Sequence, residues 1–222
     1  MALEKGIAEL VEEFIAAGRP SSRQQSITQR REGYIASAVL AGETETRVDI
    51  QTIELEGMTL RIVSPLNAPT LLPTIIYYYG GCFVSGGFAT HDNQLRQLAY
   101  YGQCRIIAVQ YRLAPEHTFP AAHDDAQRGA ELVRQHAERL GVDKQRITLA
   151  GDSAGGHLAL VTALRLKRAG EWQPAQLILI YPMLDATAHF ESYIRNGHDY
   201  IITRDTLLSR SEEHTSELQS RN

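Results

Sequence analysis

The chain has 222 residues, of which 43% are hydrophobic and 22% are charged, and its formal net charge is −4. This length and composition predict one globular domain with a substantial core and room for a small appendage. Acidic and basic residues are mixed along the chain, so the charge pattern indicates no nucleic-acid partner and favours a small-molecule partner. No apolar run approaches the roughly 20 residues of a membrane span, and the N-terminus lacks signal-peptide features, which together predict a cytoplasmic protein.

The two cysteines, Cys82 and Cys104, match no metal-ligand spacing. We expect both to be reduced, because a pair of cysteines in a chain without a signal peptide is more often free than bridged. The sequence contains no metal or cofactor motif, so no cofactor is expected.

The predicted elements begin with a helix whose apolar stripe runs from Leu3 to Ile15 and which Gly18 ends. After a polar, basic segment, the alternating stretches TRVDIQTIELEG and MTLRIVSP predict an antiparallel strand pair joined at Glu56-Gly57. Four short apolar runs then predict strands buried on both faces: TIIYYY (74–79), CRIIAVQY (104–111), RITLAG (146–151) and QLILIYPML (176–184).

Helical stripes separate these runs, an unbroken one from Ala126 to Leu140, ended by Gly141, and another from Ser153 to Arg165. Strands that alternate with helices of this length predict a mainly parallel sheet with helices on both faces.

The stretch LAGDSAGGHLAL (149–160) places Ser153 between two glycines, where a predicted strand meets a predicted helix. Such a turn holds a serine hydroxyl clear of its backbone, and we expect Gly151 and Gly155 to be required because a side chain would collide there. Free N–H groups at the helix start, beginning with Ala154, favour negative charge. A phosphate-binding loop or an ordinary tight turn is the alternative, since Gly-x-Ser-x-Gly occurs by chance in roughly one chain in twelve.

A second glycine stretch, YYYGGCFVSGG (77–87), also follows a predicted strand. Its Gly80-Gly81 pair allows the backbone to present N–H groups toward a neighbouring turn at the same sheet edge. Two sets of donors are therefore expected to face one serine.

Four motifs, in this order and spacing, resemble the hormone-sensitive-lipase-like branch of the α/β-hydrolases, which includes bacterial acetyl esterases: YYYGGCF, YRLAPEHTFPAAHDDA (111–126), GDSAGGHLA and YPMLD (181–185). The resemblance covers about residues 50 to 208. It implies an α/β-hydrolase fold with a helical cap, and a serine carboxylesterase that hydrolyses short-chain acyl esters through an acyl-serine intermediate. Ser153 matches the family nucleophile. The N–H groups of Gly81, Cys82 and Ala154 match the oxyanion hole, and Gly80 shapes the loop.

The family usually reads His-Gly-Gly-Gly-Phe where this chain has Tyr79, Gly80, Gly81, Cys82 and Phe83. Since the donors are backbone groups, Cys82 can still supply one if its φ stays negative, and Tyr79 must anchor the loop through another hydrogen bond. Cys82 as the nucleophile is a weaker alternative, since no nearby histidine is indicated.

In this family the catalytic acid follows the serine by about a hundred residues and the histidine follows about thirty later, which lies beyond this chain. His91, His117, His123 and His136 precede the serine and are expected in loops or on helix surfaces, and His157 is expected to pack. Alternatives kept open are His189 or His198 as the base, and Asp185, Asp199 or Asp205 as the acid.

Residues 210–220, RSEEHTSELQS, match the translation of a common sequencing-library adapter. We therefore interpret 209–222 as a non-native tail on a C-terminally truncated chain, which makes His214 no candidate. The expected domains are N-terminal cap helices (1–45), a partial core (46–208) with a cap-side segment from about 186, and the tail.

A truncated chain is expected to leave QLILIYPML facing solvent and to be inactive by itself. A non-catalytic ligand-binding protein on the same fold is the alternative function.

Overall fold

The computed structural model describes residues 3–18, 20, 22–185, 187–198 and 200–215. Its centre is a six-stranded sheet in the order β1-β2-β4-β3-β5-β6. The strands are β1 (Val48–Leu55), β2 (Met58–Pro65), β3 (Leu72–Tyr78), β4 (Arg105–Val109), β5 (Val142–Asp152) and β6 (Gln176–Ile180). The first two strands form the predicted hairpin, which joins β4 in antiparallel fashion.

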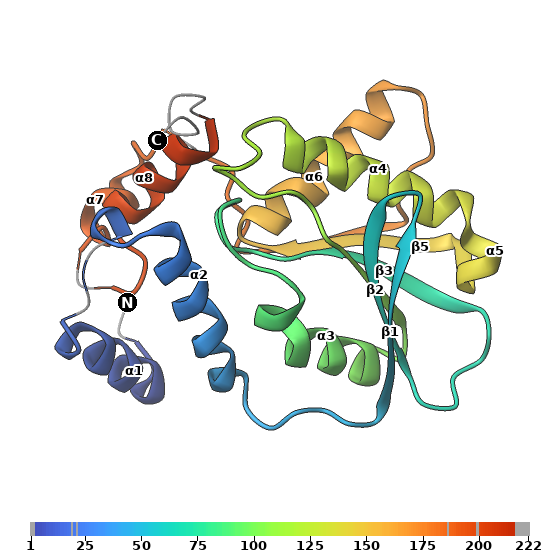
Figure 1. Ribbon diagram of the computed structural model, residues 1–222, viewed down its shortest axis with the longest axis horizontal. Helices are drawn as coiled ribbons and strands as arrows, with labels where there is room; N and C mark the ends of the chain where they lie inside the picture. The colour runs from blue at the N-terminus through green and yellow to red at the C-terminus, as the bar shows by residue number, and fades with distance from the viewer. Residues whose placement is uncertain (1–2, 19, 21, 186, 199, 216–222) are drawn as a thin grey trace.

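The other four strands are parallel. Strand β3 lies between β4 and β5, with Ile76 opposite Ile107 of β4 and Leu149 of β5. Helices cover both faces of the sheet (Figure 1). One face carries α3 (Phe88–Gly102), and the other carries α4 (Ala121–Gln135) and α6 (Ala154–Arg168). The predicted fold class, a mainly parallel sheet with helices on both faces, is confirmed.

Three consecutive tyrosines at the end of β3 are almost completely buried. Because side chains alternate across a strand, their hydroxyl groups reach different neighbours. Tyr77 donates to Asp152 Oδ1 at 2.8 Å, and Tyr78 donates to the Ala126 carbonyl of α4 at 2.8 Å. The end of this strand is thereby hydrogen-bonded on both faces of the sheet.

The helical stripe from Ala126 to Leu140 is not unbroken as predicted. At His136 the backbone leaves helical geometry (φ −95°, ψ 21°), which separates α4 from the short helix α5 (Ala137–Leu140). Gly141, with φ +64°, ends α5 as expected.

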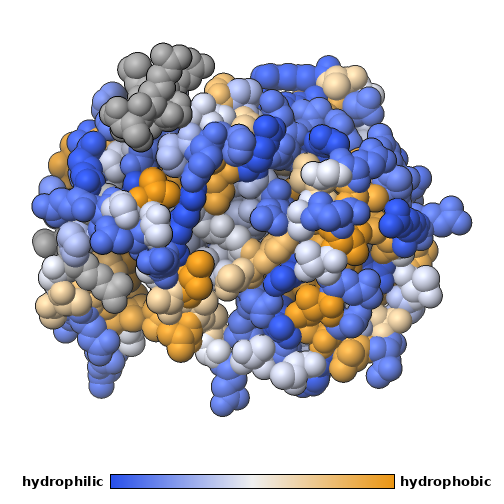
Figure 2. Space-filling view, in the orientation of Figure 1, coloured by the Kyte–Doolittle hydropathy of each residue, from blue (hydrophilic) through white to orange (hydrophobic). Residues whose placement is uncertain are grey.

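Strand β6 is less buried than the other parallel strands. This confirms the expectation that QLILIYPML faces solvent, whereas its apolar run alone predicted burial on both faces. It lies at one edge of the described sheet, and Leu177 and Ile178 expose 39% and 41% of their surface. On the face shown in Figure 2, hydrophilic side chains predominate and hydrophobic ones form separate patches.

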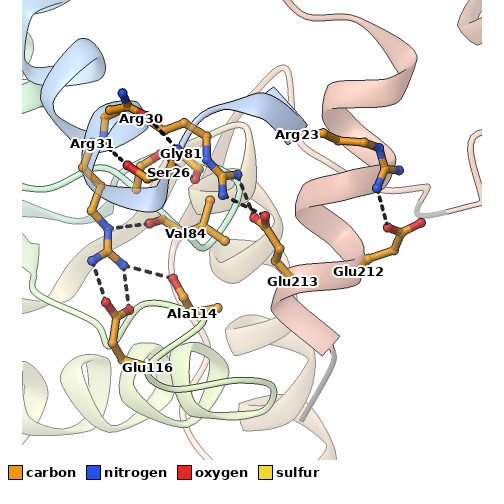
Figure 3. A network of polar contacts seen from close by, with 12 residues as sticks. Arg23, Ser26, Arg30, Arg31, Gly81, Val84, Ala114, Glu116, Glu212 and Glu213 are labelled. Carbon is orange, nitrogen blue, oxygen red and sulfur yellow. Dashed lines mark hydrogen bonds and ion pairs between the residues drawn. The ribbon is translucent and has the colours of Figure 1, made fainter. Parts of the chain in front are cut away.

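The remaining helices gather beside one end of the sheet (Figure 1). They are α1 (Lys5–Ala16), α2 (Ile27–Ala36), α7 (Glu191–Arg195) and α8 (Arg204–Thr215), with short 3-10 turns at Ser22–Gln24 and Ser37–Ala41. In the second half of α8, Glu213 forms an ion pair with Arg30 of α2 at 2.7 Å (Figure 3). Across the described part of the chain, no helix combines the length and apolarity needed to cross a membrane.

Candidate active site

Ser153 lies in the sharp turn between β5 and α6, which we call the serine turn (residues 150–156). Its backbone has φ +52° and ψ −117°, a strained conformation for a residue with a side chain. Its N–H donates to the Ile180 carbonyl at 2.9 Å, and its carbonyl accepts from the Met183 N–H at 3.0 Å. The turn is therefore fixed to the end of β6, as a serine presented at a sheet edge requires.

The glycines of the serine turn are required for the reason predicted. A Cβ at Gly151 would collide with the backbone of Gly155 and with the Tyr78 carbonyl, and a Cβ at Gly155 would collide with that same carbonyl. Strand β3 and helix α6 thus touch through backbone atoms, with no side chain between them.

The second glycine stretch forms a tight loop, which we call the Gly80 loop (residues 79–87). The Val84 and Ser85 N–H groups both donate to the Gly81 carbonyl, and Gly81 has φ +128°. The Gly80 N–H donates to Asp152 Oδ1 at 3.0 Å, so it is not free to bind a substrate. Within the described residues, no acceptor bonds the N–H groups of Gly81 or Cys82, which leaves both available as donors.

Cys82 does not meet the condition of a negative φ, although its N–H group has no acceptor among the described residues. Cys82 has φ +53° and Phe83 has φ +63°, so two consecutive non-glycine residues adopt the left-handed conformation. The loop must reverse within a few residues to bring the Phe83 carbonyl to the Ala114 N–H at 2.9 Å, which explains these angles. Cys82 and Cys104 are both free cysteines, as predicted.

Tyr79 anchors the Gly80 loop through a hydrogen bond, as expected where the family has a histidine. Its hydroxyl donates to the Tyr111 carbonyl at 3.4 Å, and the Tyr111 hydroxyl donates to the Tyr79 carbonyl at 2.6 Å. The two rings stack with centroids 4.5 Å apart. This reciprocal pair connects the start of the Gly80 loop to the segment after β4.

Arg31 of α2 holds the other side of the Gly80 loop (Figure 3). Its guanidinium donates to the Val84 carbonyl at 2.9 Å and to the Ala114 carbonyl at 3.0 Å, and it forms a bidentate pair with Glu116. The hydrogen bonds from Arg31 lower the pKa of the Glu116 carboxyl. An N-terminal helix is thereby bonded to the loop.

His91 and His123 do not lie in loops or on helix surfaces as predicted, because both are buried. His91, in the first turn of α3, has its Nε2 atom 3.2 Å from Asp152 Oδ1. Burial by itself would raise the pKa of Asp152, but the hydrogen bond and charge of His91, with donors from Tyr77 and Gly80, lower it. No sequence signal indicated this pair beyond the place of His91 after the glycine stretch.

Three other histidine rings lie around Phe83. His157 Nδ1–H donates to the Met183 carbonyl at 2.8 Å, so its Nε2 accepts from His123 Nε2–H at 3.1 Å, and His214 stacks on Phe83. Burial lowers the pKa of His123 to about 3 and that of His214 to about 4, and it also lowers that of His157. No hydrogen bond joins any described histidine to Ser153 Oγ.

The remaining acid and base candidates are not assembled at Ser153 either. His189 and His198 are exposed, as is His117, while His136 pairs with Glu56 at 2.8 Å. Asp185 accepts from Thr187, Asp205 pairs with Arg23, and Asp199 lies outside the described residues. Among the described residues no group of His, Cys, Asp and Glu side chains could hold a metal ion.

Comparison with known proteins places these features in a family. A family model for the alpha/beta hydrolase fold matches residues 75–220. The chain is 36% identical to carboxylesterase NlhH of Mycobacterium tuberculosis over 166 residues, which cover 73% of this chain and 52% of that protein. It is 34% identical to an ethyl acetate hydrolase of Pseudomonas putida over 209 residues, which cover 90% of this chain and 66% of that protein.

Solved structures agree with the sequence matches. A hyperthermophilic esterase from the archaeon Pyrobaculum calidifontis matches with 34% identity and a TM-score of 0.88, over 99% of this chain and 72% of that one. An ester hydrolase from the metagenome of Lake Arreo matches with 32% identity and a TM-score of 0.87, over 97% and 71%. The chain spans about half to two thirds of the length of the curated relatives named above. Sequence and structure together show that it belongs to the hormone-sensitive-lipase-like branch of the α/β-hydrolase family.

Proposed function

We propose that the whole protein containing this chain is a carboxylesterase that hydrolyses short-chain acyl esters through an acyl-Ser153 intermediate. The observation that carries the proposal is the strained backbone of Ser153 beside a loop with unbonded N–H groups. Strain of this kind is concentrated at functional sites, where a serine must be held clear of its backbone. The carboxylesterases and esterases that the chain resembles support the same reaction.

In the proposed reaction, Ser153 Oγ attacks the ester carbonyl carbon, and the carbonyl oxygen becomes an oxyanion. The backbone N–H groups of Gly81, Cys82 and Ala154 donate to this oxyanion, and the positive end of α6 favours its charge. The alcohol leaves, and water then attacks the acyl-serine to release the acid.

A base must accept the Ser153 proton, and a carboxylate must orient that base. We infer that both come from sequence beyond this chain, because no described histidine bonds Ser153 Oγ and because the curated relatives are longer. We further propose that α1 and α2, with the segment from about residue 186, form a cap over the site.

The test is Ser153→Ala in the whole protein, assayed with p-nitrophenyl acetate. We expect hydrolysis to fall by at least about 10³-fold, because the nucleophile is lost while the binding groups remain. Ser64→Ala, on β2 and away from the serine turn, should keep the wild-type rate. Unchanged hydrolysis by Ser153→Ala would refute the assignment. A wild-type protein that binds esters without turning them over would indicate the non-catalytic ligand-binding alternative.

A further inference from the structure

The carboxylate of Asp152 connects the two segments that the proposed reaction uses. Asp152 directly precedes Ser153, and its side chain turns toward β3 and the Gly80 loop, where it is 4% exposed. Oδ1 accepts hydrogen bonds from the Tyr77 hydroxyl and from the Gly80 N–H. One carboxylate oxygen therefore joins the serine turn to the first peptide of the donor loop.

The Gly80 loop passes directly against this carboxylate. A Cβ added at Gly80 would collide with Asp152 Oδ2, and it would also lie 3.0 Å from the Asp152 carbonyl. The position of the start of the loop thus depends on where the Asp152 side chain lies. Any rotation of that side chain would displace the N–H groups of Gly81 and Cys82, which follow next in the chain.

His91 fixes the Asp152 side chain from a third element. Its Nε2 atom lies 3.2 Å from Oδ1 and 3.3 Å from Oδ2, and the ring is 3% exposed. The rings of Tyr77 and Tyr79 lie 6.4 Å and 5.9 Å from it, and Tyr34 of α2 meets it edge-on at 6.0 Å. Aromatic rings on several sides leave the imidazole little freedom to turn.

The hydrogen bonds of His91 fit a ring that carries a proton on Nε2. Nε2 faces the Asp152 carboxylate, whose pKa is lowered by the hydrogen bond from His91, and an ionised carboxylate can only accept. Nδ1 lies 2.8 Å from the Thr90 hydroxyl oxygen, which also contacts the Gly87 N–H and carbonyl. Both ring nitrogens therefore have a polar partner, and the one on Asp152 is a donor.

We propose that His91 is a positioning residue for the ester hydrolysis proposed above, acting through Asp152 to hold the Gly80 loop at the distance from Ser153 that oxyanion binding needs. His91 does not itself touch the reacting atoms. Misplacing a donor by about 1 Å at such a site costs up to roughly 10²-fold in rate. Loss of His91 therefore lowers kcat and leaves substrate binding nearly unchanged.

The experiment compares His91→Ala, His91→Gln and the control His136→Gln in the whole protein, below the unfolding temperature of each. His136 pairs with Glu56 through a similar nitrogen-to-carboxylate contact on the surface, outside the site. We expect kcat to fall by about 10- to 100-fold in His91→Ala with KM changed less than about threefold. His91→Gln, whose amide N–H can still donate to Asp152, should recover part of the loss, and His136→Gln should match the wild type.

A trifluoromethyl ketone separates positioning from general stability. Ser153 Oγ forms a bond to its carbonyl carbon, and the resulting oxyanion occupies the donors of the loop. If His91 positions those donors, the inhibition constant rises by the same factor by which kcat/KM falls. A lower melting temperature with unchanged kcat, or a rate loss without a matching loss of inhibitor affinity, would overturn the proposal.

A further measurement does not depend on activity, so it tests the proposal even if His91→Ala does not fold. In ¹⁵N-histidine-labelled wild-type protein, the ring resonances that disappear in His91→Gln should show a proton on Nε2, and an unprotonated Nε2 would overturn the proposal. Hydrolysis that survives Ser153→Ala would instead contradict the proposed function, and it would not change the result for the Nε2 proton of His91.

Discussion

The serine turn and the Gly80 loop both hold residues with side chains at positive φ, but different groups support them. In the serine turn, Gly151 and Gly155 bring backbone directly against backbone of β3. In the Gly80 loop, side chains from other elements provide the support, namely Arg31 of α2, Tyr111 after β4, and Asp152 at the end of β5. The turn is therefore held by backbone contacts that its own glycines permit, whereas the loop is held by side chains of residues distant in the chain.

The largest expected effect comes from adding one methyl group to the serine turn. Gly155→Ala should destabilise the protein by about 3 kcal/mol or more, because its Cβ would meet the Tyr78 carbonyl and neither backbone segment can move aside. Urea unfolding measures the loss. Gly33→Ala in α2, where no atom lies within 4 Å of the new Cβ, is the control and should stabilise by about 0.5–1 kcal/mol. Similar stabilities for the two variants would contradict the backbone-contact account.

A smaller effect is expected in the Gly80 loop, where strain at Cys82 can be isolated by comparing two variants. Cys82→Gly and Cys82→Ala both remove the thiol, but only glycine relieves the left-handed backbone at φ +53°. Cys82→Gly should therefore be more stable than Cys82→Ala by about 1 kcal/mol, measured by thermal and urea unfolding. An alanine variant as stable as the glycine variant would show that the loop relaxes to another path.

The smallest expected effect concerns the Glu116 carboxyl that pairs with Arg31. Because this pKa is lowered on folding, the pair stabilises the protein above the ordinary Glu pKa of about 4.3 and loses that contribution as pH falls through the lowered value. Glu116→Gln should cost less than about 1 kcal/mol at pH 7, since the carboxylate is partly exposed. The difference from wild type should shrink toward pH 3 and in high salt, and a difference independent of pH would rule out the ion pair as its source.

The sequence allowed the sheet, the hairpin and the serine turn to be predicted because their determinants lie close together in the chain. Apolar runs give the strands, and the two glycines beside Ser153 give the turn. The break at His136 was missed, because the apolar stripe continues across it and only the backbone angles reveal it.

The environment of Asp152 could not be predicted, since its partners come from β3, the Gly80 loop and α3. His91 lies 61 positions before Asp152. That ring is buried by the packing of α3 against the sheet and by Tyr34 of α2. The positive φ of Cys82 could not be predicted for a related reason, because the loop is hydrogen-bonded at Phe83 to the Ala114 N–H of a distant segment.

The three tyrosines at the end of β3 have a consequence for how the molecule responds to heat. Their hydroxyl groups bond in turn to the end of β5, to α4 and to the segment after β4. Elements on both faces of the sheet are thus hydrogen-bonded to the end of one strand. Unfolding the site alone would break these hydrogen bonds on both faces, so local unfolding is unfavourable. The environment of Ser153 and the tertiary structure of the sheet should therefore be lost in a single cooperative transition, with near-ultraviolet dichroism of the tyrosines reporting both events at once.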